Sequence, residues 1–176
     1  MNARLPRLTM TLLFAVSLAF ALPKEGDDVG KGTVVDVDGN TFTVESTLGK
    51  PLLIVYEDKN SGTQNNALKE ELGTFARDPK YKSMVLLAAI ADVSSYNFWP
   101  ARGFVKDAIR KESTKANTPI YCDWTGAFRE ALGLTRGKSN IVFVDKAGKV
   151  RYVAAGSMGE GARKRLLDLI RKEVEG

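Results

Sequence analysis

Apolar and polar positions follow two different periods within residues 51–75. Residues 51–56 form an uninterrupted apolar run rich in branched and aromatic side chains, which is typical of a buried strand. Ser61 and Gln64 then have the spacing of a capping box, which predicts that a helix begins directly after Ser61. Three apolar residues follow at the spacing of one helix face: Leu68, Leu72 and Phe75. The pattern therefore predicts a strand, a short polar loop and a helix.

The loop between this strand and helix is the first candidate binding site, because ligands of α/β sheets bind at the carboxyl ends of strands. It carries polar and charged side chains and no cysteine: Glu57, Asp58, Lys59, Asn60 and Ser61. We expect these residues to contribute to a binding surface; the alternative is a solvated loop with a helix cap. Glu57 and Asp58 are adjacent on an extended chain, so their carboxylates should diverge and not act together on one substrate.

A β-hairpin is predicted at residues 31–45. Valine alternates with aspartate on one side of Asp38-Gly39, and phenylalanine and valine alternate with threonine on the other side. Asp36, Asp38 and Asn40 occupy alternate positions, as calcium ligands can, but the loop lacks the glycine and the distal glutamate of an EF-hand. We therefore expect a plain turn and no metal site.

Further apolar runs predict the remaining strands. Residues 83–91 are largely apolar without alternation, which is typical of a parallel strand covered on both faces. The Asp-Pro-Lys segment at residues 78–80 is expected to interrupt the secondary structure before this strand. The other predicted strands are residues 118–122, 139–144 and 149–154, the last two as an antiparallel pair around a Lys-Ala-Gly turn.

Three more helices are predicted from apolar faces and capping residues. The first begins at Pro100. Its apolar face combines aromatic and aliphatic residues: Phe104, Val105, Ala108 and Ile109. A brief helix capped by Asp123 ends near Gly133, and a capping box at Ser157 and Glu160 opens an amphipathic C-terminal helix.

The predicted order of elements is a hairpin followed by β-α-β-α-β-α-β-β-α. Alternating strands and helices require parallel pairing with right-handed crossovers. We therefore predict an α/β fold in which a central mixed sheet is flanked by helices, with an N-terminal β-hairpin extension.

Residues 1–21 have the pattern of a secretory signal peptide. Arg4 and Arg7 precede an apolar run at residues 8–19, and Ala19-Phe20-Ala21 has the small-x-small pattern of a cleavage site. The apolar run is too short to span a bilayer comfortably. We expect cleavage after Ala21 and a periplasmic or secreted product without a membrane anchor.

Removal of the signal peptide would leave a short segment at residues 22–30 and one domain at residues 31–176. Without Arg4 and Arg7, 24 of the 26 basic side chains remain against 21 acidic ones, and both signs are interspersed. Such a mild excess is typical of a solvated surface, so no nucleic-acid partner is expected.

Cysteine and histidine usage excludes several kinds of site. The chain has one cysteine, Cys122, and no histidine. An intramolecular disulfide, a Cys/His zinc site and a Ser-His-Asp triad are therefore impossible, and no cofactor is indicated. Cys122 is either a buried structural residue or a candidate catalytic thiol. The adjacent Asp123 should raise the pKa of that thiol and lower its reactivity.

Four ring-bearing residues gather where the helix near residue 100 begins: Tyr96, Phe98, Trp99 and Pro100. If exposed, they would form a protein-contact surface, because tryptophan and tyrosine are common interface anchors. The alternative is that they cover the core at the helix entry. Trp99 is therefore included among the candidate binding residues.

Three segments carry a resemblance to a known superfamily: residues 49–55, 123–134 and 140–150. The first is a Gly-Lys-Pro turn with an apolar strand, the second joins Asp123 and Gly126 to an Ala-Leu-Gly-Leu segment, and the third is a strand with an Asp-Lys-Ala-Gly turn. In this order they resemble the thioredoxin-like superfamily, in particular redoxin and TlpA-like domains. The polar loop in place of cysteines, Asn66-Ala67-Leu68 and Asp145-Lys146-x-Gly148 make the chain similar to the YtfJ family of exported, thioredoxin-like proteins.

The chain departs from that superfamily at two parts of the redox site. Residues 57–61 contain no cysteine, so dithiol exchange and peroxide reduction lack their thiolate there. The superfamily's cis-proline would fall at Ser139 or Asn140, which we add to the candidate binding residues. The resemblance without these parts implies a non-catalytic binding module that uses the former active-site edge, with another periplasmic protein as its partner. The alternative is a thiol oxidoreductase that acts through Cys122 alone.

Overall fold

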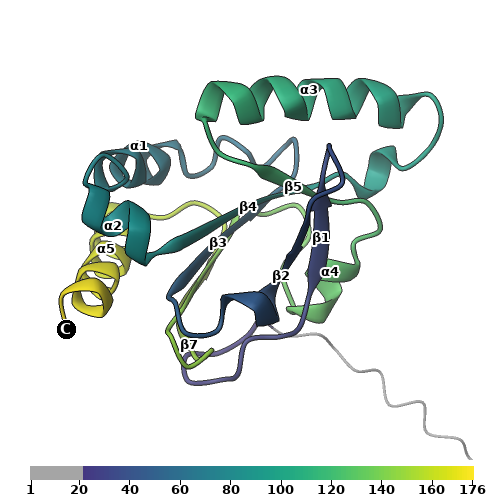
Figure 1. Cartoon of the computed structure of the whole chain (residues 1–176). Coiled ribbons are helices and arrows are strands. Elements are labelled where there is room, and N and C mark those ends of the chain that lie inside the picture. Colours follow the sequence, from purple (N-terminus) through teal and green to yellow (C-terminus); the bar gives the residue numbers. More distant parts are fainter. Residues whose placement is uncertain (1–21) are drawn as a thin grey trace, which may run out of the picture.

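A computed structural model describes residues 22–176, so the predicted signal peptide lies outside the described residues. The described chain forms one seven-stranded mixed sheet with helices on both faces (Figure 1). The strands, from one edge of the sheet to the other, are β2 (Thr41–Thr43), β1 (Thr33–Asp36), β5 (Ile120–Asp123), β4 (Leu86–Asp92), β3 (Leu52–Glu57), β6 (Asn140–Val144) and β7 (Val150–Ala155). The predicted hairpin is confirmed, and it continues the main sheet because β1 pairs with β5.

Parallel pairing unites the three central strands, as the continuous apolar runs predicted. β3 pairs with β4, and β4 pairs with β5, both in parallel. The predicted pair at the other edge is also confirmed, since β6 is antiparallel to both β3 and β7. The three parallel strands therefore bring their carboxyl ends to one edge of the sheet.

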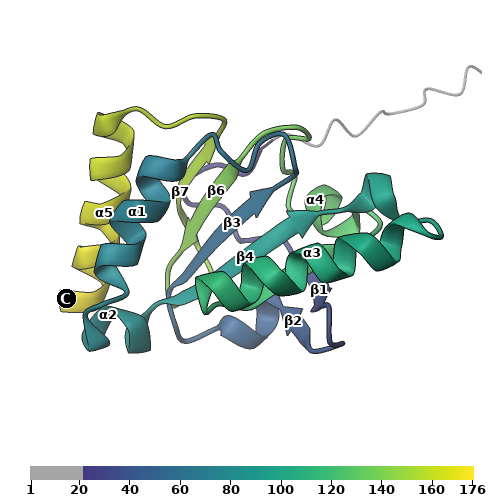
Figure 2. The same cartoon turned by 90° about the horizontal axis from the view of Figure 1, so that it is seen from above.

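The helices form two layers around the sheet: α1 (Asn66–Phe75), α2 (Pro79–Met84), α3 (Ala101–Ala116), α4 (Ala127–Ala131) and α5 (Glu160–Glu175). Figure 2 shows α1, α3 and α5 over one face, with α4 behind the sheet. Two short 3-10 turns, at Val44–Thr47 and Ser94–Tyr96, complete the connections. None of the helices between residues 22 and 176 has the length and apolar content that crossing a bilayer requires.

Alternation along β3 divides the core between the two faces. Ile54 and Tyr56 pack on the α4 face, with Phe128 of α4. Leu53 packs on the opposite face, against Leu68 of α1 and other residues of α1 and α5. Neighbouring side chains of a strand point to opposite faces, so one buried strand supplies both halves of the core.

One helix and one boundary differ from the prediction. The segment at residues 78–80, where an interruption was predicted, is the start of α2. The Asp78 side chain accepts a hydrogen bond from the Lys80 amide, and Pro79 is the first helical residue. An aspartate cap followed by proline is a helix-start signal, and here it marks the start of α2. Because α2 takes up Ser83 and Met84, β4 begins at Leu86 and not at Ser83.

Both predicted capping boxes are wrong. α1 begins at Asn66, after Asn65, because the Ser61 side chain bonds within a turn with Asp58. α5 begins at Glu160 after Gly159, without a side-chain cap. A capping-box spacing is short enough to occur by chance, and here it falls on turns that precede the helices.

The predicted apolar face of α3 is only half correct. Val105 and Ile109 pack against a small cluster that contains Cys122. Phe104, in contrast, is 74% exposed, and Ala108 is also exposed. No residue of α3 is buried, so α3 lies on the sheet more loosely than α5, which buries four apolar side chains.

Candidate functional site

The carboxyl edge of the parallel strands carries two polar clusters on opposite faces of the sheet. Glu57 ends β3, Asp92 ends β4 and Asp123 ends β5, and Asp92 lies opposite Asp123 in the strand register. Tyr56 and Glu57 are neighbours on β3, so their side chains diverge. We call the group around Glu57 on the α1 face the Glu57 cluster, and the group around Asp92 on the α4 face the Asp92 cluster.

Both carboxylate oxygens of Glu57 have partners inside the Glu57 cluster. Oε2 lies 2.6 Å from Nζ of Lys69, and Oε1 accepts a 2.7 Å hydrogen bond from the Ser139 hydroxyl. Ser139 is completely buried, and its amide donates to the side-chain oxygen of Gln64. Glu57 therefore holds α1 and the start of β6 together, and its carboxylate is engaged on both sides.

Asn65 extends this cluster beneath the loop. Its buried amide group donates to the Ser139 hydroxyl at 2.9 Å and to the Gly156 carbonyl at 3.0 Å. Its side-chain oxygen accepts from the Met158 amide at 2.8 Å. A thioredoxin-type enzyme would have its cysteines at the start of α1. In this chain the Asn65 side chain occupies that place, and its hydrogen bonds join the loops before α1, before β6 and after β7.

Asp58 and Ser61 close a tight turn between β3 and α1. Asp58 Oδ1 accepts from the backbone amides of Asn60 and Ser61 at 2.9 and 2.7 Å, and from the Ser61 hydroxyl. Ser61 is fully buried, whereas Lys59 and Asn60 are exposed. Glu57 and Asp58 share no partner: Glu57 contacts Lys69 and Ser139, whereas the Asp58 side chain bonds within its own turn.

Asn140 also has an internal role. It is fully buried, its amide group donates to the carbonyls of Thr135 and Lys138, and its oxygen accepts from the Thr135 amide. It thereby fixes the loop that leads into β6. Of the candidate residues at this edge, Ser61, Ser139 and Asn140 are enclosed in the protein, and Lys59 and Asn60 reach solvent.

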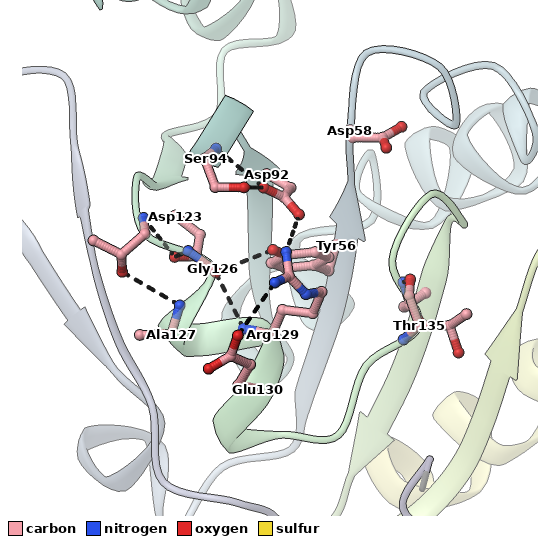
Figure 3. A network of polar contacts seen from close by, with 12 residues as sticks. Tyr56, Asp58, Asp92, Ser94, Asp123, Gly126, Ala127, Arg129, Glu130 and Thr135 are labelled. Atoms are coloured by element: carbon pink, nitrogen blue, oxygen red, sulfur yellow. Dashed lines mark hydrogen bonds and ion pairs between the residues drawn. The ribbon is translucent and has the colours of Figure 1, made fainter. Parts of the chain in front are cut away.

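Figure 3 shows the Asp92 cluster, which the sequence analysis did not predict. The Tyr56 hydroxyl donates to Asp123 at 3.0 Å, and the Arg129 guanidinium lies 2.7 Å from Asp92. Ser94 donates to Asp92 through both its amide and its hydroxyl. Three strands, the 3-10 turn at Ser94–Tyr96 and α4 supply these groups, and the order of strands in the sheet brings them together.

The N-cap residue of α4 is Gly126 and not the predicted Asp123, but the Asp123 side chain still accepts hydrogen bonds at this helix end. Its carboxylate accepts from the amides of Gly126 and Arg129 at the start of α4, at 2.8 and 3.1 Å. The same carboxylate accepts from Tyr56, so it ties α4 to the sheet. Capping of a helix N-terminus by a buried aspartate is a structural role, and it leaves little capacity for a ligand.

Within the Asp92 cluster Arg129 neutralises Asp92, and hydrogen bonds satisfy the Asp123 carboxylate. Burial alone would raise the pKa of Asp92, but hydrogen bonds from Ser94 and Arg129 outweigh it and lower the pKa. Burial and the carboxylates of Asp123 and Asp92 raise the pKa of the Tyr56 hydroxyl. Asp92 is therefore ionised and Tyr56 is neutral at physiological pH, which suits a fixed network and not a proton-transfer site.

Cys122 lies on the other face, beneath α3. It is 2% exposed and packs with Val37, Val93 and Trp124. Burial raises the pKa of its thiol to about 11; the carboxylate that adds to this effect is Asp36 of β1. The expected influence of Asp123 is thus wrong, because the Asp123 side chain points to the opposite face, where it meets Tyr56.

Exposed aromatic rings lie at the beginning of α3. Trp99 is 91% exposed, Phe98 is 58% exposed, and Phe104 follows on the first turn of the helix. Tyr96 is half-buried and packs against the cluster that contains Cys122. We call Phe98, Trp99 and Phe104 the aromatic surface. The sequence left open whether these rings are exposed or cover the core at the helix entry, and the structure shows that Phe98 and Trp99 are exposed.

Comparison with solved structures shows that other proteins share this fold. A thiol peroxidase from Chromobacterium violaceum has a TM-score of 0.57 and 18% identity, covering 84% of this chain and 88% of that chain. The exposed lipoprotein thioredoxin Etrx1 from Streptococcus pneumoniae has a TM-score of 0.53 and 15% identity, covering 81% and 98%. An uncharacterized conserved protein from Geobacillus kaustophilus has a TM-score of 0.65 and 16% identity, covering 87% and 83%. At such low sequence identity, the structural similarity establishes the thioredoxin-like fold and nothing further.

Sequence comparison gives a narrower assignment. No curated protein matches the chain. A family model described as "Bacterial protein of unknown function (YtfJ_HI0045)" matches residues 62–173, which include every helix and strand from α1 to α4, together with β6, β7 and most of α5. The polar loop, the Asn-Ala-Leu segment and the Asp-Lys-x-Gly turn had suggested this assignment, and the match confirms it. The chain is therefore a thioredoxin-like protein that belongs to the YtfJ_HI0045 family.

Proposed function

We propose that this protein is a thiol-independent binding module that contacts a protein partner through its aromatic surface. The observation that carries the proposal is Trp99, whose side chain lies almost wholly in solvent at 91% exposure. Phe98 precedes it and Phe104 follows it on the first turn of α3, and exposed apolar patches mark interaction sites. Tryptophan is also the side chain that most often dominates the energy of a protein interface.

The rest of the edge supports this role as a rigid scaffold. The Glu57 and Asp92 clusters satisfy their own polar groups and fix the loops that follow β3, β4 and β5. Trp99 follows β4 in the chain, so the aromatic surface is attached to this fixed edge through the 3-10 turn at Ser94–Tyr96. Lys59 and Asn60 are exposed on the loop after β3 and could extend the contact.

The alternative function, redox chemistry through Cys122, has less support. With a pKa of about 11, the thiol would be ionised in about one molecule in ten thousand at pH 7. The sulfur is also buried beneath α3. A reactive thiol needs both a thiolate and access, and Cys122 has neither.

The partner that we propose is another exported protein. This part of the proposal rests on the signal-peptide pattern of residues 1–21. The protein would meet its partner in the periplasm or outside the cell. Such a contact uses surface groups and requires no cofactor.

Photocrosslinking in the native cell tests the proposal. A Phe98→p-benzoylphenylalanine variant places a photoreactive ring beside Trp99 and leaves Trp99 in place. We expect irradiation to give one discrete adduct of higher mass. The control carries the same residue at Lys164, an exposed position of α5 on another part of the protein.

The expected result is an adduct from position 98 and none from position 164. Addition of Trp99→Ala to the position-98 variant should reduce the adduct by at least about tenfold, as for an interface hot spot. Equal adducts at both positions, or no adduct at either, would contradict a specific contact at the aromatic surface.

A further inference from the structure

We infer that the partner's contact surface is acidic; this inference rests on the proposed function and specifies its partner. It comes from the outward face of α3, which continues from the aromatic surface along the helix. Residues spaced by four, three and four positions share this face: Phe104, Ala108, Lys111 and Lys115. All four are exposed. One ring at the beginning of the helix is thus followed by two ammonium groups.

These two lysines differ from the two arginines of α3, which have partners, and from Lys106, which is half-buried. Arg102 lies over the ring of Trp124 at 4.5 Å, and Arg110 pairs with Asp38 and Asp107. Within residues 22–176, Lys111 and Lys115 have no ion pair and no side-chain hydrogen bond. Their charges are available to a partner without breaking an internal contact.

The surface between them is hollowed. A shallow depression on α3 has one acidic, one hydroxyl and three basic residues in its lining: Asp107, Arg110, Lys111, Thr114 and Lys115. Because Arg110 is paired with Asp38 and Asp107, Lys111 and Lys115 are the cations of this depression that remain to attract a carboxylate of a partner. Complementary charge around an aromatic anchor adds rate and specificity to an interface.

An acidic protein fits this face better than an anionic membrane does. A helix that lies in a membrane interface needs a continuous apolar face. The outward face of α3 is apolar only at Phe104 and Ala108, and Asp107 and Glu112 are exposed on the same helix. An isolated ring beside separate charged groups is suited to a protein partner, in which a pocket can accept the ring and side chains can pair with the charges.

The test is a selection of displayed random-sequence peptides against the purified full chain. Peptides are kept when they bind the protein but not its Trp99→Ala variant. We expect the kept peptides to carry an excess of aspartate and glutamate around an apolar residue. The strongest of them is synthesised, and its affinity is measured by fluorescence anisotropy at two salt concentrations.

A charge reversal then locates the contact. The double substitution Lys111→Glu/Lys115→Glu should lower the affinity for the synthesised peptide about tenfold at about 50 mM salt and less than about twofold at about 500 mM salt. The control is Lys164→Glu/Lys172→Glu on α5, which changes the net charge equally at two other exposed lysines. It should leave the affinity within about twofold, because its charges lie away from α3.

The possible outcomes separate the two proposals. Trp99-dependent peptides without an acidic excess, or without sensitivity to the α3 reversal, overturn the acidic partner and leave the binding module intact. Failure to obtain any Trp99-dependent peptide counts against the binding module itself. Trp99-dependent sedimentation with vesicles of phosphatidylglycerol and phosphatidylcholine, at roughly 1:3, would replace the protein partner with a membrane surface and overturn both.

Discussion

At the scale of single residues, Cys122 shows how environment decides the chemistry of a side chain. The thiol lies among Val37, Val93 and Trp124, and burial raises its pKa to about 11. Arg102 and Lys106 oppose this increase, but more weakly than burial acts. The residue therefore behaves as a small apolar side chain, although it is the one cysteine of the chain.

Thiol labelling checks this description. In the folded protein we expect less than about 5% of Cys122 to react with iodoacetamide at pH 7.5, because thiolate and access are both lacking. In denaturant the reaction should be complete, and intact mass measures both states. A Ser95→Cys variant in a Cys122→Ala background, at an exposed position, should react without denaturant. Rapid labelling of native Cys122 would restore the one-cysteine redox hypothesis.

Asp92 gives a prediction about pH. Its hydrogen bonds from Ser94 and Arg129 lower its pKa, so its stabilising contribution is present above about pH 4, the usual unfolded value, and is lost as pH falls through the lower folded value. Asp92→Asn should reduce the free energy of unfolding by roughly 2–4 kcal/mol at pH 7, since Arg129 loses its buried partner.

Urea unfolding at several pH values measures this effect. The difference between the wild type and Asp92→Asn should be constant above about pH 5 and should shrink below about pH 4. The control Asp168→Asn removes an exposed carboxylate of α5 and should change stability by less than about 1 kcal/mol throughout. A difference that grows on acidification would show that the sign assigned to Asp92 is wrong.

At the scale of elements, Asn65 tests whether the loop before α1 is held as a scaffold. Asn65→Ala would leave the Gly156 carbonyl and the Met158 amide without their partner, so we expect a loss of roughly 2–4 kcal/mol in urea unfolding. Asn66→Ala, one residue on and exposed, is the matched control and should cost less than about 0.5 kcal/mol. If the two substitutions had equal effects on stability, the structural role assigned to the Glu57 cluster would be wrong.

α3 provides a test that separates folding from binding. Trp99→Ala and Phe104→Ala should each change the free energy of unfolding by less than about 0.5 kcal/mol, because both rings lie in solvent. Phe128→Ala on α4 should cost roughly 3–5 kcal/mol, since its ring is fully buried. A cost above about 1.5 kcal/mol for Trp99→Ala would mean that this ring supports the fold.

The buried strands and the Asp-Gly hairpin could be predicted from the sequence, whereas the capping boxes and the buried face of α3 could not. The β3 run and the face at Leu68 appear as expected, because burial of many side chains constrains them. Ser61 misled the prediction because its hydroxyl serves the Asp58 turn, and local side-chain bonds compete with helix caps. Phe104 misled it because apolar spacing on α3 does not show which face meets the sheet.

At the scale of the whole molecule, the fold could be predicted and the arrangement at its edge could be predicted only in part. The resemblance identified the loop that lacks cysteines and the place where the cis-proline is missing, and the structure shows that Glu57 of this loop and Ser139 at this place are hydrogen-bonded. The Asp92 cluster joins Tyr56, Asp92 and Arg129, which are far apart in the sequence. Such a cluster needs the register of three strands, and one sequence without that register gives no signal for it.

The most direct test of the account is photocrosslinking from position 98 in cells that carry either Cys122→Ala or Trp99→Ala. We expect the adduct to persist with Cys122→Ala and to fall at least about tenfold with Trp99→Ala, because the contact uses the aromatic surface and not the thiol. Loss of the adduct with Cys122→Ala and its persistence with Trp99→Ala would contradict the binding module and favour thiol chemistry.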